Sequence, residues 1–141
     1  FYVHRAMAVT GLGDRLFEEL QPWYDQLAAG LTTWAETPDP TRSDCHAWSA
    51  SLNVELFRMI LGIESAAPGF RQVRIAPSLG GLKHVSGAVP HPAGEIAVDC
   101  RTDSKGRLTA KIALPIGMTG EFVWQGRTFA LRAGKQILKI E

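Results

Sequence analysis

The spacing of apolar residues changes once along this chain, between residues 61 and 70. In the first part, apolar residues recur near the helical period of about 3.6. The pattern predicts short helices between residues 2 and 30, with breaks at Gly11 and Pro22 and an end at Gly30. The clearest predicted helix spans 46–61, with Gly62 placed to end it.

The helix expected over 46–61 is apolar nearly all the way round, which is typical of a helix buried on most sides. Ser43 or Asp44 can cap its start. Four short helices cannot bury so much apolar surface on their own. We therefore expect this half to pack against further protein, and to expose an apolar helix face and self-associate when isolated.

From about residue 70 the apolar period becomes two, which is typical of strands with one buried face. Seven segments alternate in this way: RQVRIAP, HVSGAV, GEIAVDCR, RLTAKIAL, GEFVWQ, RTFALR and QILKIE. Glycine- and proline-rich turns separate them. The pattern predicts a small antiparallel β-sandwich, joined to the helices by a hinge at 66–69.

Composition and charge argue against some classes of partner but do not identify one. Of the 141 residues, 45% are hydrophobic and 21% charged, and the formal net charge is +1. This near-neutral balance offers no electrostatic reason to expect nucleic acid or an anionic membrane as a partner. No apolar run approaches the roughly 20 residues of a membrane span. The chain has no initiator methionine and no signal peptide, so we expect a piece of a longer protein.

The loop 30–49 contains the candidate catalytic and binding residues, because it combines aromatic and ionisable residues with prolines. Glu36 could act as a general base on water, although a solvated loop glutamate is the simpler reading. Trp34 and Trp48 could stack on a sugar or pack in the core. His46 could donate to a ligand hydroxyl or begin the following helix. Arg42 and Asp44 could bind hydroxyls or pair with each other, and the structural salt link is the simpler reading.

Metal and cofactor chemistry are not expected. Asp44, Cys45 and His46 are consecutive, and neighbouring helical residues point about 100° apart, so they make a poor chelate. The spacing of Cys45 and Cys100 does not favour a disulfide. No phosphate-binding loop or dinucleotide fingerprint is present.

Together, several of these segments carry a family resemblance. GLTTWAE, TRSDCHAWSAS, a helix ending in LGI, APGFRQVRIAPSLGGL and VPHPAGEI resemble the C-terminal part of bacterial α-L-rhamnosidases of the six-hairpin type. The resemblance implies an α+β fold, with residues 1–65 as the last helices of an (α/α)6 barrel. Residues 66–141 would form the C-terminal antiparallel β-sandwich.

The resemblance also implies an inverting glycosidase that acts on rhamnose-containing glycosides. By its place in T-T-x-x-E, Glu36 corresponds to the general base, and His46 to a rhamnose-binding residue. Trp34 or Trp48 would line the sugar subsite, although Ala35 stands where many members carry tryptophan. The general acid belongs to the upstream part of the barrel, which this chain lacks, so we expect the chain to be inactive alone.

Two other classes of function stay open. The β half could be a non-catalytic carbohydrate-binding module with Phe122, Trp124 and Phe129 as its platform, or a purely structural domain. Phe122 and Trp124 fall on one face of their predicted strand, and that face is as easily core. The helical half could belong to a six-hairpin glycosidase with another sugar preference.

Overall fold

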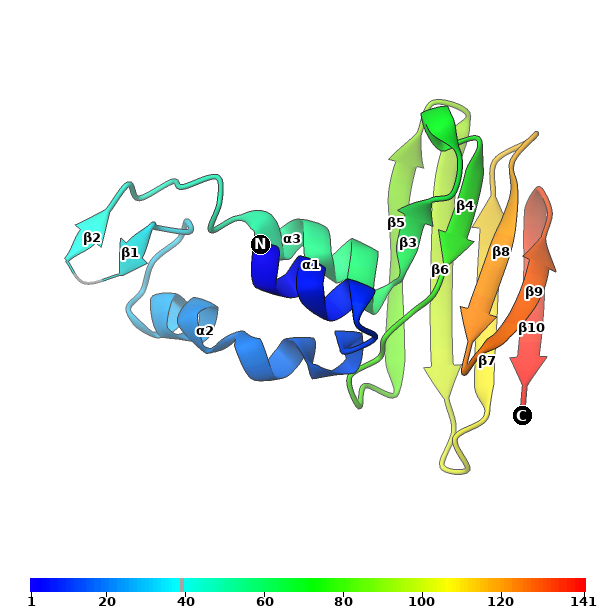
Figure 1. Ribbon diagram of the computed structural model, residues 1–141, viewed down its shortest axis with the longest axis horizontal. Helices are drawn as coiled ribbons and strands as arrows, with labels where there is room; N and C mark the ends of the chain where they lie inside the picture. Colours follow the sequence, from blue (N-terminus) through cyan, green and yellow to red (C-terminus); the bar gives the residue numbers. More distant parts are fainter. Residues whose placement is uncertain (39) are drawn as a thin grey trace.

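A helical layer and a two-sheet sandwich lie at opposite ends of the chain (Figure 1). The computed structural model describes residues 1–38 and 40–141. The helical layer contains α1 (Tyr2–Val9), the 3-10 helix η1 (Gly13–Glu19), α2 (Gln21–Ala28), α3 (Ser51–Glu55) and the π-helical turn η2 (Leu56–Ile60). Asp39, which stands between two prolines of the sequence, lies outside the described residues.

The predicted helix breaks at Gly11, Pro22 and Gly30 are confirmed. Gly11 and Gly30 follow α1 and α2 with φ of 74° and 78°, in the left-handed region that glycine enters without a Cβ penalty. Proline lies in the first turn of α2, where its missing N–H would have no helical partner.

The helix predicted over 46–61 is wrong in its first turn and a half. Residues 47–50 form turns, and α3 begins only at Ser51, without a side-chain cap among the described residues. The Nε1–H group of Trp23 donates to Ser49 O at 2.7 Å, and so occupies the carbonyl that a helix would offer to Asn53. Asn53 N–H donates to Ala50 O instead. Tertiary contact has therefore shortened the helix, and neither Ser43 nor Asp44 caps it.

All seven predicted strands are present in the sandwich. One sheet has the order β10-β7-β6-β5 and the other β3-β4-β8-β9. The bounds are β3 Ile63–Ser65, β4 Gln72–Ile75, β5 His84–His91, β6 Gly94–Thr102, β7 Leu108–Leu114, β8 Thr119–Trp124, β9 Arg127–Leu131 and β10 Gly134–Ile140. A 3-10 turn, η3 (Pro68–Phe70), lies in the expected hinge.

Two features of the sandwich depart from the sequence pattern. The pair β4–β8 is parallel, although the other pairs described in the two sheets are antiparallel. Strand β3 is only three residues long, too short to show an alternating pattern, and it pairs with β4. The domain division after residue 65 stays a prediction; β3, just before it, already hydrogen-bonds within the sandwich.

The core between the sheets continues toward the helical layer. Phe122, Ile75, Ile96, Leu108 and Ile112 are the large apolar residues at its centre, all essentially buried. At Gly87 of β5, an added Cβ would collide with the side chain of Leu61, which follows η2. Glycine at this place therefore lets the helical layer approach the sheet closely.

One face of α3 and η2 remains apolar and open in this chain. Val54 is 52% exposed and Phe57 41% exposed. Both line a groove of about 810 Å³ between these helices and the sandwich. These exposed side chains agree with the expectation that this helix exposes an apolar face. Within the described residues, no helix is long and apolar enough to cross a membrane.

Candidate functional site

The loop 30–49 folds as an irregular antiparallel ribbon at the end of the helical layer remote from the sandwich (Figure 1). Strands β1 (Thr37–Pro38) and β2 (Thr41–Arg42) form its tip. Below them, Glu36 N–H donates to Arg42 O at 3.0 Å, and His46 N–H donates to Trp34 O at 2.7 Å. These bonds bring the two sequence motifs, TTWAE and CHAWS, side by side.

The other edge of this ribbon is held by Gln26 of α2. Its Oε1 atom accepts from Ala35 N–H at 2.8 Å, and its Nε2 donates to Ala35 O at 3.3 Å. Ala35 is fully buried and Gln26 is 5% exposed. The residue before Glu36 is thus fixed by two hydrogen bonds out of contact with water.

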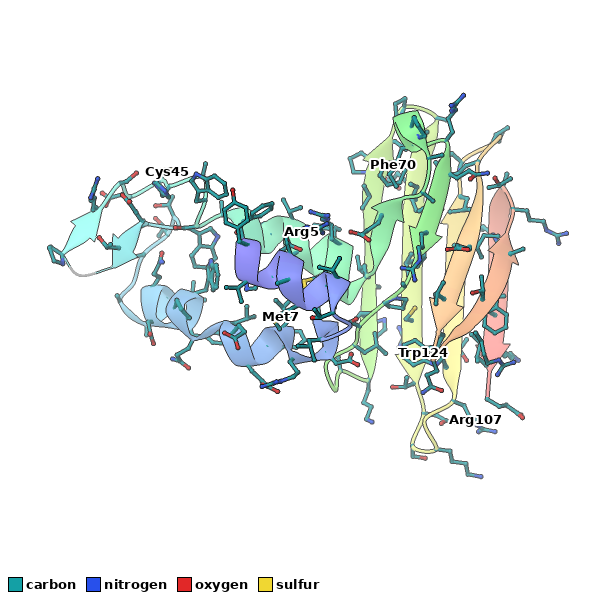
Figure 2. The ribbon with its side chains drawn as sticks, viewed as in Figure 1. Arg5, Met7, Cys45, Phe70, Arg107 and Trp124 are labelled. Atoms are coloured by element: carbon teal, nitrogen blue, oxygen red, sulfur yellow. The ribbon has the colours of Figure 1, made fainter. Side chains whose placement is uncertain are left out.

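A pocket of about 350 Å³ opens beside this ribbon. It is lined by Phe1, Pro22, Trp23, Gln26, Glu36, His46, Trp48 and Ser49. All of these residues belong to the helical half, and none comes from the sandwich. Figure 2 shows the same separation, with Cys45 beside the hairpin and Trp124 far away in the sheets. Three of the four sequence-predicted site residues, Glu36, His46 and Trp48, therefore meet at one pocket.

The fourth predicted residue, Trp34, is placed differently. It is half-buried and does not line this pocket. Its carbonyl oxygen accepts the backbone N–H of His46. Trp34 therefore helps to hold the ribbon through its backbone, and a role for its indole in a sugar subsite stays a prediction.

Glu36 lies at the pocket with one cationic neighbour. Its Oε2 atom is 3.2 Å from Nε of Arg42, and its side chain is partly open to solvent. The expected salt link between Arg42 and Asp44 is not among the ion pairs of the described residues; Arg42 pairs with Glu36 across the hairpin. The second oxygen of the carboxylate remains available to accept a proton or a hydrogen bond.

His46 and Trp48 form other parts of the wall. His46 Nδ1 lies 3.0 Å from Ser43 Oγ, which leaves Nε2 as the ring atom for an outside partner. The indole of Trp48 is exposed and meets the Phe1 ring edge-on at 5.6 Å between centroids. Tyr2 also contacts this indole, at 5.8 Å with planes tilted by 34°, and the exposed part of the indole can contact a ligand.

Five of the residues that line the pocket were not predicted from the sequence as site residues, and these include Trp23 and Gln26 of α2. Trp23 and Gln26 lie three residues apart on α2, so they share one face of that helix. The sequence pattern assigns Trp23 to an apolar helix face, and its indole also packs on buried His4. The signal available in the sequence was the i, i+3 spacing of a tryptophan and a glutamine, which puts both on one face of the helix.

The described residues contain no cluster of three or more His, Cys, Asp and Glu side chains arranged to hold a metal ion. Cys45 is exposed and Cys100 is buried, and both are free thiols. Burial raises the pKa of Cys100 to about 12, and the neighbouring Asp99 charge acts in the same direction. The chemistry offered by the pocket is therefore that of one carboxylate, one imidazole and aromatic faces.

Solved structures share this fold over nearly the whole chain. An α-L-rhamnosidase from Aspergillus terreus superposes with a TM-score of 0.86 at 20% identity, over 96% of this chain and 18% of that one. The Streptomyces avermitilis α-L-rhamnosidase, solved with L-rhamnose, gives 0.83 at 20% identity, over 96% and 17%. The enzyme from Dictyoglumus thermophilum gives 0.83 at 16% identity, over 99% and 20%. The chain thus spans about a fifth of the length of these structures.

Sequence comparison gives the family directly. No curated protein matches the chain. The family model described as the bacterial alpha-L-rhamnosidase C-terminal domain matches residues 62–136, which is more than half of the chain. The matched residues cover nearly all of the sandwich, and the structural likeness extends through the helical layer. The chain belongs to the bacterial α-L-rhamnosidase C-terminal domain family.

Proposed function

We propose that this chain is the C-terminal part of an inverting α-L-rhamnosidase and contributes the general base, Glu36, and part of the sugar pocket. The observation that carries the proposal is the meeting of Glu36, His46 and Trp48 at one pocket. A carboxylate, a hydrogen-bonding imidazole and aromatic faces are the groups that a glycosidase subsite needs. The family membership and the rhamnosidase neighbours support the same substrate class.

In the proposed reaction, a terminal α-L-rhamnoside lies against Trp48 and Trp23 with a hydroxyl at His46 Nε2. Glu36 takes a proton from a water molecule as the water oxygen attacks the anomeric carbon. The bond from that carbon to the leaving oxygen breaks at the same time, and a carboxylic acid on the opposite face protonates the leaving oxygen. Inverting enzymes hold these two carboxyl groups roughly 6.5–9.5 Å apart, to leave room for the water.

Among the described residues that line the pocket, Glu36 is the one carboxylate. A single carboxylate cannot both activate water and protonate the leaving group on opposite faces of the ring. We therefore propose that the general acid comes from an upstream part of a longer protein. The chain alone should then be inactive.

The open apolar face of α3 and η2 fits the same picture. Val54 and Phe57 lie on a helix surface that a complete helical barrel would cover. We propose that the upstream part of the barrel packs there, and that without it the face drives self-association of the isolated chain.

A carbohydrate-binding role for the sandwich gains no support from the side chains first considered for it. Phe122 is fully buried between the sheets and cannot stack on a sugar. Trp124 and Phe129 pack against the same core, and Arg127 lies over the Phe129 ring at 5.2 Å. A structural role is the one that we propose for the sandwich.

The test is hydrolysis of an aryl α-L-rhamnoside by the longer protein and by this chain. Glu36→Gln in the longer protein should lower kcat by about 10²–10⁴-fold or more, since it removes the general base. Glu95→Gln, at an exposed glutamate of β6, is the control and should retain full turnover. Unchanged kcat in the Glu36 variant would remove that residue from the proposed role, and turnover by this chain alone would show that the acid is not upstream.

A further inference from the structure

Gln26 takes no part in the bond-breaking or proton-transfer steps just proposed, yet it makes the most enclosed polar contact of the site. The Gln26 amide meets the N–H and C=O groups of Ala35 together, at 2.8 and 3.3 Å, as a neighbouring strand would. Both residues are buried, so water cannot replace these bonds at low cost. The geometry therefore ties α2 to the residue that directly precedes Glu36.

The hydrogen bonds of residues 34–36 alternate in direction, which explains why a side chain makes the contact at Ala35. Trp34 O and Glu36 N–H point toward the second arm of the ribbon, where they bond to His46 and Arg42. The backbone groups of Ala35 point the opposite way, since successive residues of an extended chain alternate their hydrogen-bonding directions. Among the described residues no third strand pairs on that side, and the Gln26 amide takes its place.

Few side chains could substitute for this amide. Glutamine carries a donor and an acceptor at the end of a chain long enough to reach from a helix to a neighbouring strand. A leucine of similar size would leave the buried N–H and C=O of Ala35 without partners, which costs about 1–3 kcal/mol for each unsatisfied group. The ribbon would then be expected to shift toward water or toward another donor.

We propose that Gln26 is a positioning residue for Glu36: by fixing the Ala35 peptide groups it sets the direction in which the Glu36 carboxylate enters the pocket. This inference rests on the proposed function for its effect on turnover, but not for its effect on the backbone. A misplacement of a reacting group by about 1 Å can cost roughly 10²-fold in rate. Loss of the Gln26 bonds should therefore lower kcat more than it changes KM.

The backbone part is tested on this chain by hydrogen exchange followed by NMR. In Gln26→Leu, the Ala35 amide should exchange at least about tenfold faster than in the wild type, since its acceptor is removed. Gln21→Leu is the matched control, because Gln21 lies on the same helix but donates to Asp25 on the surface. Equal exchange at Ala35 in the wild type and in Gln26→Leu would overturn the inference at its first step.

The catalytic part is tested in the longer protein with an aryl α-L-rhamnoside. Gln26→Leu should lower kcat by about 10–100-fold with KM changed less than about threefold, whereas Gln21→Leu should match the wild type. A loss confined to KM would show that Gln26 binds sugar and positions nothing. Turnover that falls in Glu36→Gln but not in Gln26→Leu would overturn this inference alone, whereas unchanged turnover in Glu36→Gln would overturn the proposed function.

A second variant keeps the test meaningful if Gln26→Leu does not fold. In Gln26→Glu, the introduced carboxylate can accept from Ala35 N–H but cannot donate to Ala35 O. Its protonated form can do both, as the amide does. The kcat of Gln26→Glu relative to the wild type should therefore rise as the pH falls. A ratio that does not change with pH would contradict a role that depends on both bonds.

Discussion

The imidazole of His4 packs against the indole of Trp23, with ring centroids 5.5 Å apart and planes tilted by 34°. His4 is buried on α1 and does not line the pocket, so it supports the Trp23 wall from behind. Desolvation by burial lowers the pKa of His4 below its usual 6.5, and the positive N-terminus of this chain adds to the effect. The negative charges of Glu55 and Glu19 act against that shift.

This lowered pKa predicts that His4 makes stability depend on pH. As the pH falls, the unfolded chain binds this proton at a higher pH than the folded chain does. Protonation therefore stabilises the unfolded state relative to the folded state. The contribution of His4 to the free energy of unfolding is complete above about pH 6.5. It is lost as the pH falls from that value to the lower pKa of the folded state, with a slope of at most about 1.4 kcal/mol per pH unit. Urea unfolding between about pH 5 and pH 8 should show this slope in the wild type. The slope should be absent in His4→Gln and retained in His84→Gln, an exposed control.

Glu55 is a fully buried carboxylate whose oxygens have no hydrogen-bond partner among the described residues. Its nearest cation is Arg58, at 3.9 Å. A buried carboxyl group without hydrogen bonds is costly, and Arg58 would keep Glu64 as a partner at 3.1 Å, so Glu55→Met should raise the free energy of unfolding of this chain by about 1–3 kcal/mol. Glu64→Met is the contrasting variant, because Glu64 pairs with both Arg5 and Arg58 at 3.3 and 3.1 Å. A decrease in stability in Glu55→Met, measured by urea unfolding, would contradict this account.

Gly62 follows the helical layer at the point where the chain enters the sandwich. Its φ is 70°, and an added Cβ would overlap the backbone of Ala76. Gly62→Ala should therefore lower the free energy of unfolding by about 3 kcal/mol or more, from the φ strain together with the overlap. Gly106→Ala separates the two causes, because Gly106 has a φ of 79° but open space around it. That control should lose only about 1–2 kcal/mol.

The two thiols should differ sharply in reactivity. Cys45 is exposed in the loop 30–49, whereas Cys100 is buried on β6 with a pKa of about 12. Because the thiolate is the reactive form, an aromatic disulfide reagent near pH 8 should modify one thiol in the folded chain and two after unfolding. Cys45→Ser should abolish the fast reaction. Rapid labelling of that variant in its folded state would contradict the buried position of Cys100.

The open apolar face of α3 and η2 should bind a hydrophobic dye. Val54→Lys and Phe57→Lys should each lower dye fluorescence and any self-association seen by sedimentation, because they place a charge on that face. Ile116→Lys is the control, since Ile116 is 92% exposed at a turn of the sandwich, away from this face. Equal fluorescence in all four proteins would show that the dye does not bind there.

Seven of the eight strands that the structure describes in the sandwich could be predicted, because each repeats apolar residues with a period of two and glycine or proline marks its ends. Strand β3 could not, since three residues are too few to reveal a period. The parallel pairing of β4 with β8 also has no local signal, because which strands become neighbours depends on the packing of the two sheets.

The candidate site divides in a similar way. Its chemical residues, Glu36, His46 and Trp48, could be named from motifs in one stretch of sequence. The start of α3 could not be placed, because the indole of Trp23, 26 residues earlier, takes the carbonyl of Ser49.

The sequence by itself determined which segments alternate, where glycines end helices, and which residues could carry chemistry, since these depend on neighbours along the chain. Only the tertiary structure decided how the loop 30–49 is held. The bonds from Gln26 to Ala35, and the ion pair from Arg42 to Glu36, join residues that local propensity does not connect. The Gln26 bonds form because burial removes the Ala35 backbone groups from water, and the exposed ion pair forms because the hairpin brings two opposite charges together.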